Sequence, residues 1–371
     1  MRGYALLGLR RIADGCLSYQ EALGVDEESA ATRLGIAKCA IARRQYETAQ
    51  GELTQSLKLD PKNPEAIILK GDLAQILSDP KGAAAAYREA VKLNPAHIVA
   101  NLRLAAANIA EGDFVAARKG IAVVHQQAPS HLHGQYLKAL LLFREGKNAQ
   151  ARDALQELLK VAPDNMPGIV LAGAVAYTLK TYGQAEKYFS RFLERYPGSI
   201  YVRRLMAETL LQTRQPQRAL EHLKPLMAGQ GAEASIYALA GEAYMQLNDF
   251  NQATAHFEKA AALAPENAAI RTELGASRLG AGQSDRALAE LGGAIGLDPG
   301  QSKAGTLVVL IHLQRGEFDK ALDALAGWKK RDQQNPVVEN FYGMAYLGKG
   351  ETQTARMHFE KALSLNPTFI G

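Results

Sequence analysis

Residues 83–95 read AAAAYREAVKLNP and contain the pattern that decides the fold. An alanine, Ala83, is followed four residues later by a large ring, Tyr87, and eight residues after that by Pro95. The pattern returns every 34 residues without an insertion or a deletion. The proline position is held in turn by Pro61, Pro95, Pro129, Pro163, Pro197, Gly231, Pro265, Pro299, Gln333 and Pro367. A fixed period of this length indicates a repeat architecture instead of separate globular domains.

Three further positions recur with the same period. The alanine position is held by Ala49, Ala83, Ala117, Ala151, Ala185, Ala219, Ala253, Ala287, Ala321 and Ala355. Four residues later stands a large apolar residue, as at Leu53, Tyr87, Ile121, Leu155, Phe189, Leu223, Phe257, Leu291, Leu325 and Phe359. Twelve residues before the alanine stands a small residue, with Val309 as the exception: Ala37, Gly71, Ala105, Ala139, Gly173, Ala207, Gly241, Gly275, Val309 and Gly343.

The physical meaning of these positions is a pair of packed helices. In each unit the apolar residues fall at helical spacing in two runs, separated by a short polar turn such as Gly112-Asp113 or Asn248-Asp249. The small residue in the first run and the alanine in the second let two helix backbones approach closely, and the large residue fills the space beside them. Proline ends the second helix. The sequence therefore predicts an all-α fold.

A 34-residue helix pair with this pattern resembles the tetratricopeptide repeat. The resemblance covers residues 30–369, in units that start at 30, 64, 98, 132, 166, 200, 234, 268, 302 and 336, and residues 1–29 are expected to form a partial repeat or a capping helix. It implies a right-handed α-solenoid, a superhelix of about ten units. The pattern departs from the family at Gly231, Gln333 and Val309, and Trp328 stands where small residues are common. Since Val309 and Trp328 share one unit, residues 302–335, we expect looser or re-angled packing there.

Three segments resemble one bacterial subfamily more closely. Residues 135–146, 200–211 and 316–322 look like the tetratricopeptide lipoprotein that accompanies the exosortase (PEP-CTERM) sorting and exopolysaccharide system. The resemblance implies a role in envelope assembly and a place in the periplasm or cell envelope. Gly15 precedes Cys16 as in a lipoprotein signal, but Arg10 and Arg11 interrupt the apolar run, so we interpret the first residues as a helix. A cytoplasmic location, and a chain that is part of a longer repeat protein, therefore both stay open.

In the tetratricopeptide family the first helix of each unit lines the concave surface of the superhelix. Inward positions of these helices are mostly apolar here: Leu34, Ile41, Ile68, Leu102, Ile109, Leu140, Val170, Leu279, Leu310 and Leu313. The sequence thus predicts an apolar groove suited to an amphipathic helix or an extended apolar peptide.

The units that start at 132, 166 and 200 differ from this apolar lining. Their inward positions hold aromatic and charged residues, which we take as the candidate partner-binding site: His133, Tyr136, Phe143, Arg144, Tyr177, Tyr201, Arg204 and Glu208. Tyrosine and arginine dominate binding energy at protein interfaces. The alternative is that the rings pack between neighbouring repeats. No asparagine occupies the position that chaperone-binding relatives use to hold a C-terminal carboxylate, so we do not expect such a clamp.

Composition and motifs argue against several other classes. The net charge is +5, but basic and acidic residues are mixed along the chain, which does not indicate nucleic-acid binding. The longest uncharged apolar stretch, residues 168–179, is shorter than the roughly 20 residues of a membrane-spanning helix. Cys16 and Cys39 are too few for a disulfide framework or a zinc site, and we expect both to be buried small apolar residues.

Neither catalysis nor a cofactor is indicated. The eight histidines lack zinc-protease spacing, and His97, His131 and His133 stand near unit boundaries without cysteines or carboxylates. The glycine-rich residues 292–296 lie inside an expected helix and do not follow a strand, unlike a phosphate-binding loop. We therefore expect no metal, no cofactor and no enzymatic activity.

The sequence leaves two functions open. The first is a non-catalytic scaffold that binds a protein or peptide in its concave groove, by resemblance in envelope exopolysaccharide or surface-protein assembly. The alternative is the substrate-recruiting region of a larger enzyme such as a glycosyltransferase. Self-association is a further option, because the last residues, 367–371, show no polar capping helix to cover the final apolar face.

Overall fold

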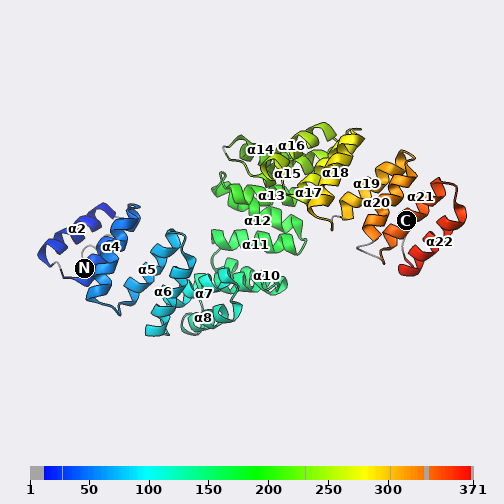
Figure 1. Ribbon diagram of the computed structural model, residues 1–371. Helices are drawn as coiled ribbons and strands as arrows, with labels where there is room; N and C mark the ends of the chain where they lie inside the picture. Colours follow the sequence, from blue (N-terminus) through cyan, green and yellow to red (C-terminus); the bar gives the residue numbers. More distant parts are fainter. Residues whose placement is uncertain (1–11, 27, 230, 301, 330–333, 369–371) are drawn as a thin grey trace. The chain divides into compact units, whose positions relative to one another are not determined.

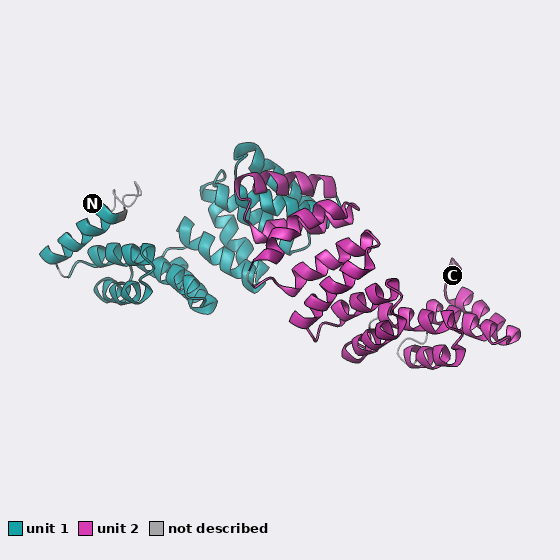
Figure 2. Cartoon of the chain, turned by 90° about the horizontal axis from the view of Figure 1, so that it is seen from above, with its two compact units in different colours: residues 1–181 teal, residues 182–371 magenta. Residues whose placement is uncertain are grey.

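The structure, a computed structural model, describes residues 12–26, 28–229, 231–300, 302–329 and 334–368. These residues form 21 α-helices, α2 to α22, and no β-strand (Figure 1). The chain divides into two compact units, residues 1–181 and 182–371, which Figure 2 shows in different colours. The all-α prediction is confirmed.

Unit 1 holds α2 (Ile12–Val25) and then alternating first and second helices. The first helices are α3 (Ala30–Ala42), α5 (Pro64–Ile76), α7 (Ile98–Glu111), α9 (Leu132–Arg144) and α11 (Met166–Thr178). The second helices are α4 (Tyr46–Leu59), α6 (Pro80–Leu93), α8 (Phe114–Gln127) and α10 (Asn148–Val161). Each of these first helices begins at the first residue of a 34-residue repeat.

Unit 2 continues the alternation in the same register. Its first helices are α13 (Ile200–Gln212), α15 (Ala234–Gln246), α17 (Ala268–Gly280), α19 (Ser302–Gln314) and α21 (Pro336–Gly348). Its second helices are α12 (Tyr182–Arg195), α14 (Pro216–Ala228), α16 (Phe250–Leu263), α18 (Ser284–Leu297), α20 (Phe318–Lys329) and α22 (Thr352–Leu365).

Within each unit, every helix packs against the next along the chain. The first helices of successive repeats also contact one another, as α3 does with α5, α7 with α9, and α15 with α13. Contacts between successive second helices are sparse in the described part of each unit. A row of helix pairs that is closer-packed along its first helices curves toward them, so these helices lie on the inner side of each unit.

The turn inside each repeat uses one residue with a left-handed backbone. These residues recur every 34 positions: Arg44, Ser78, Gly112, Gly146, Lys180, Arg214, Asn248, Gly282, Gly316 and Gly350. Glycine adopts a positive φ at no steric cost, whereas a residue with a Cβ atom does so at a cost of roughly 1–2 kcal/mol. Half of the turns therefore carry local backbone strain.

Side chains cap the N-termini of most first helices. Residues 34 positions apart accept a hydrogen bond from a backbone N–H two or three residues later: Ser29, Asn63, His97, His131, Asn165, Ser199, Asn267 and Asn335. Such caps satisfy N–H groups that a helix start leaves without a partner. A second recurring bond ties the preceding turn to the helix, since Asn101, Gln135, Arg203 and Arg271 each donate to the carbonyl of the proline six residues earlier.

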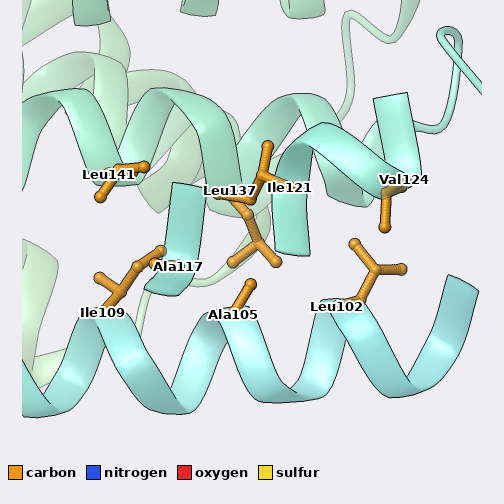
Figure 3. Close-up of a cluster of buried hydrophobic side chains, with 8 residues drawn as sticks. All are labelled: Leu102, Ala105, Ile109, Ala117, Ile121, Val124, Leu137 and Leu141. Carbon is orange, nitrogen blue, oxygen red and sulfur yellow. The ribbon is translucent and has the colours of Figure 1, made fainter. Parts of the chain in front are cut away.

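The core is a series of small clusters, each formed where neighbouring helices meet. In one of them, Ala105 and Ile109 of α7 meet Ala117 and Ile121 of α8 and Leu137 of α9 (Figure 3). Since α9 belongs to the next repeat, each cluster joins a helix pair to its neighbour. The fold is thus an α-solenoid, in which a repeat is stabilised by the repeats beside it.

The small and large repeat positions pack against each other, as predicted. The ring of Tyr87 covers Gly71, the ring of Phe257 covers Gly241, and the ring of Phe359 covers Gly343; a Cβ atom on any of these glycines would collide with the ring. Where the small residue is alanine, its partner position holds Leu or Ile, as at Ala105 and Ile121. The rings thus lie opposite glycine, although Gly275 faces Leu291 and Val309 packs with Leu325 at the same two positions.

The prediction for the two cysteines is wrong in one respect. Cys16 of α2 and Cys39 of α3 are buried, at 1% and 4% exposure, but they are joined by a disulfide with a Cα–Cα distance of 5.6 Å. The bond forms because α2 packs along α3 and brings the two side chains together, which a separation of 23 residues does not reveal. Residues 1–11, on which the choice between a helix and a lipoprotein signal depends, lie outside the described residues.

The repeat that carries Val309 and Trp328 borders a cavity. A cavity of about 240 Å³ lies between α18, α19 and α20 and is lined by Ile295, Val308 and the Trp328 ring, among others. The ring lies over Gly305 of α19, where a Cβ atom would lie 3.4 Å from the ring. Gln333, the other departure in this unit, lies outside the described residues.

Candidate binding surface on the first helices

The inner side of each unit is formed by a fixed set of positions on the first helices. The eight predicted site residues lie on the first helices α9, α11 and α13, five of them in unit 1 and three in unit 2. The unit 1 group consists of His133, Tyr136, Phe143, Arg144 and Tyr177, and the unit 2 group of Tyr201, Arg204 and Glu208. We describe the two groups separately.

The predicted apolar groove is wrong for several of its members. Leu34, Ile68, Leu102 and Ile109 are buried in the core clusters and do not form a surface. They are buried because each first helix is covered by the first helix of a neighbouring repeat, and helical spacing alone does not show how closely that neighbour approaches. The surface that remains is more polar than the sequence suggests.

In unit 1, two of the candidate rings lie together. His133 is exposed and stacks on Tyr136, with 5.9 Å between the ring centroids. Tyr136 also packs against the core cluster of α7, α8 and α9, so part of its ring serves the junction between repeats. Desolvation and the nearby charges of Arg103 and His131 lower the pKa of His133, which favours the neutral imidazole.

The remaining unit 1 residues occupy different settings. Phe143 and Tyr177 are half-buried, whereas Arg144 is exposed at the end of α9. Arg103, which we expect near this surface, forms an ion pair with Asp72 of the preceding repeat at 2.9 Å. Arg103 therefore already has an acidic partner within the protein.

In unit 2, the structure brings the three predicted residues into one group on α13. Tyr201 is 54% exposed, and the guanidinium of Arg204 lies over its ring at 5.9 Å from the centroid. Arg204 also pairs with Glu208 one turn later, at 3.9 Å. An arginine held between a ring and a carboxylate keeps a defined orientation, because both contacts constrain its long side chain.

Sequence reasoning missed a carboxylate next to this group. Burial raises the pKa of Glu208, Arg204 opposes that shift, and the charge of Glu242 adds to it. Glu242 stands 34 residues after Glu208, on α15, and its own pKa is raised by desolvation and by Glu273 of α17. Lys303 of α19 pairs with Glu273 at 2.5 Å. The signal was present in the sequence, since Glu208 and Glu242 share one repeat position.

Two of the histidines near unit boundaries have a structural explanation. Nδ1 of His97 accepts a hydrogen bond from the backbone N–H of Ala100 at 3.2 Å, and Nδ1 of His131 accepts one from Gly134 at 3.3 Å. Both therefore serve as helix caps, at the position that Ser or Asn occupies in other repeats. In the part of the chain that the structure describes, no group of three or more His, Cys, Asp or Glu could hold a metal ion.

None of the helices between residues 12 and 368, leaving aside the undescribed positions, is both long and apolar enough to cross a bilayer. The longest helices have 14 residues, whereas a span needs about 20.

Family models described as tetratricopeptide repeat match most of the chain. They match residues 34–98, 74–141, 136–200, 234–267, 278–344 and 340–369. No curated protein matches the sequence.

Solved structures with the same fold are distant in sequence. A tetratricopeptide repeat protein from Parabacteroides merdae ATCC 43184 is 16% identical with a TM-score of 0.51, over 67% of this chain and 98% of that one. PilW, a type IV pilus biogenesis factor, is 17% identical with a TM-score of 0.51, over 56% of this chain and 96% of that one. At these identities the likeness concerns the fold alone.

Proposed function

The chain belongs to the tetratricopeptide repeat family, and from this premise we propose that it is a non-catalytic scaffold that binds a peptide or a segment of a protein on the inner side of its first helices. The fold supports this proposal because a row of helix pairs presents a long side-chain surface without a closed catalytic pocket.

The observation that carries the proposal is the group on α13. Tyr201 is exposed, Arg204 lies over its ring, and Glu208 lies 3.9 Å from Arg204 one turn later on α13. Exposed tyrosine and arginine with restricted side chains contribute most of the binding energy at interfaces, because little conformational entropy is lost on binding. The His133–Tyr136 stack supplies a second aromatic group in unit 1.

We place this scaffold in the bacterial envelope, in exopolysaccharide or surface-protein assembly. The subfamily resemblance of residues 135–146, 200–211 and 316–322 suggests this role. The Cys16–Cys39 disulfide supports it independently, because disulfides persist in oxidising compartments such as the periplasm and are rare in a reducing cytoplasm.

The test is quantitative capture of envelope proteins by the full chain. Envelope extract is passed over the wild-type protein and over a variant with Tyr136→Ala and Tyr201→Ala, and bound proteins are quantified by mass spectrometry. We expect at least one specific partner to fall tenfold or more with the variant. The control is Tyr196→Ala, which removes a ring of similar exposure, 46%, at the residue that follows the second helix α12.

Two outcomes would count against the proposal. Equal capture by the double variant and the wild type, with unchanged helical circular dichroism, would remove the aromatic groups from the binding surface. Full reduction of the Cys16–Cys39 bond in protein isolated from its native cells would argue against the envelope location.

A further inference from the structure

A second groove in unit 1 lies away from the inner surface. A cavity of about 450 Å³ opens between α4, α5 and the start of α6, and its apolar lining includes Leu53 and Leu57 of α4, Leu73 of α5 and Leu77, the C-cap residue of α5. Leu53 and Leu73 are buried at its base, whereas Leu77 is 48% exposed at its mouth. Leu77 is therefore a half-exposed apolar side chain beside an open apolar cavity, and such exposed apolar surface often marks an interaction site.

The groove and the inner surface use different sides of α5. The inner side of this helix carries Ile68, which is buried against α6 and α7, and Asp72, which pairs with Arg103 of α7, while the groove is lined by Lys70, Leu73 and Leu77. At 3.6 residues per turn the two sets lie on different sides of the helix. A partner in the groove would therefore leave the inner surface free.

The rim of the groove is positively charged. Lys58 of α4 and Lys70 of α5 both line it and are exposed, and neither forms an ion pair with another described residue. The one acidic lining residue, Asp79, is occupied locally, because its Oδ1 accepts a hydrogen bond from the backbone N–H of Gly82 at 2.9 Å. Two uncompensated lysines beside an apolar base complement an acidic, amphipathic partner.

The lining has the spacing of a helix-binding groove. Leu53 and Leu57 lie at i and i+4 on α4, and Leu73 lies near the end of α5, four residues before the C-cap residue Leu77. Two such rows form an apolar channel between helices, which accepts the i, i+3, i+4 and i+7 side chains of a third helix. The open side of the channel gives such a helix access from solvent.

The next repeat lacks this combination. The residues 34 positions after Lys70 and Leu77 are Leu104 and Glu111, so both the rim charge and the exposed apolar side chain are absent there. Lys92 stands 34 positions after Lys58 but does not line the groove. Lys70 and Leu77 therefore distinguish this groove from the next repeat, although cavities also open at the same junction of helices between α8, α9 and α10 and between α18, α19 and α20.

We propose that this groove docks an acidic amphipathic helix of a partner protein. Its leucine-type side chains enter the channel between α4 and α5, and its carboxylates pair with Lys58 and Lys70. The partner is defined by this chemistry and is independent of whatever binds the inner surface.

Binding is measured with the full chain and a labelled synthetic peptide of 18 residues. The peptide is designed as an amphipathic helix with Leu at i, i+3, i+4 and i+7 and Glu on its flanks. Two further peptides serve as probes. One has Lys in place of each Glu. The other has the same composition as the acidic peptide in a scrambled order, so that it has no apolar face. Fluorescence anisotropy gives the Kd, and size-exclusion chromatography with light scattering reports the oligomeric state.

The variants reverse each part of the interaction. Lys58→Glu with Lys70→Glu should weaken the acidic peptide at least tenfold and strengthen the basic peptide. Leu77→Glu introduces the residue that Glu111 supplies in the next repeat and should abolish binding of the acidic peptide. Lys92→Glu is the matched control and should leave the Kd within twofold of the wild-type value.

Four results would overturn the proposal. One is no binding of the acidic peptide, and another is equal binding of the scrambled peptide. A third is a Kd that does not respond to reversal of the two lysines. The last is a dimer of the free chain that Leu77→Glu dissociates, which would assign the groove to a second copy of this chain. Lys58, Lys70 and Leu77 are all exposed, so we expect each variant to fold. Circular dichroism checks this.

Discussion

The ring of Tyr87 on α6 lies where a Cβ atom on Gly71 of α5 would have to stand. The same relationship joins Gly241 to Phe257 and Gly343 to Phe359, whereas Ala37 faces Leu53 in the first repeat. A ring of this size fits between two helices only if the opposite helix presents no side chain. A ring at one position thus requires glycine at the other, whereas leucine occurs opposite Ala37, Gly275 and Val309.

Gly71→Ala is expected to destabilise the protein by roughly 1–3 kcal/mol, because the added methyl group overpacks the join between α5 and α6. Combining it with Tyr87→Leu should recover part of the loss, since the pair then matches Ala37 and Leu53. Urea unfolding followed by circular dichroism measures both.

The control for this prediction is Gly51→Ala on α4. No atom lies within 4 Å of the place where its Cβ would stand, so the substitution should stabilise the helix by roughly 0.5–1 kcal/mol. Equal effects at Gly51 and Gly71 would show that helix propensity, and not the contact with Tyr87, determines the stability.

Replacing strained turn residues by glycine should stabilise the protein. Arg44, Lys180 and Arg214 have φ values of 60°, 58° and 55°, at the position that Gly112 holds in its own repeat. Each substitution relieves backbone strain in the folded state but gives the unfolded chain more conformational entropy. The net gain in the free energy of unfolding is about 0.5–1 kcal/mol for each. Differential scanning calorimetry of the triple variant should show a higher Tm.

The reverse substitution, Gly112→Ala, should destabilise by a similar amount. Its Cβ would meet no neighbouring atom, so the loss would come from the backbone alone. A triple glycine variant that melts below the wild type would contradict the assignment of strain to these turns.

Stability should depend on pH through Glu339 of α21. Its side chain is 1% exposed. Oε1 lies 3.0 Å from Nζ of Lys329 and 2.9 Å from Nζ of Lys361, and Oε2 lies 2.7 Å from Nδ1 of His358. Burial alone would raise the pKa of Glu339, but the hydrogen bonds from His358, Lys361 and Lys329 outweigh it and lower the pKa to about 2.

Because the folded pKa lies below that of the unfolded chain, the contribution of Glu339 is present above about pH 4.5 and is lost as the pH falls toward 2. Glu339→Gln should therefore cost roughly 1–3 kcal/mol at pH 7 and much less at pH 2.5. Urea midpoints across this range measure the difference. Glu351→Gln, which removes an exposed carboxylate, is the control, and a Glu339→Gln effect that is constant with pH would refute the ionic role.

Reduction of the Cys16–Cys39 disulfide should loosen α2 from α3. For a loop of this length the chain-entropy model gives roughly 3 kcal/mol of stabilisation. Hydrogen exchange of residues 12–42 should increase with reductant and in the Cys16→Ala, Cys39→Ala variant. In that variant, reductant should have no further effect, and a reductant-induced change there would assign the loosening to another cause.

The sequence alone determined the repeat and the ends of its helices. A 34-residue period, an alanine that permits close helix packing and a capping or turn residue at fixed intervals act through neighbours in the chain, so they are readable without coordinates. Helical spacing likewise places Tyr201, Arg204 and Glu208, the candidate residues of unit 2, on one side of α13.

The tertiary structure decided what each of those positions faces. Leu34 and Leu102 belong to the core, His97 and His131 cap helices, and the two cysteines form a bond. Each outcome depends on how closely one helix approaches another, a distance set by the side chains of two repeats together. Period and composition specify which residues recur, whereas burial and pairing follow from the packing between them.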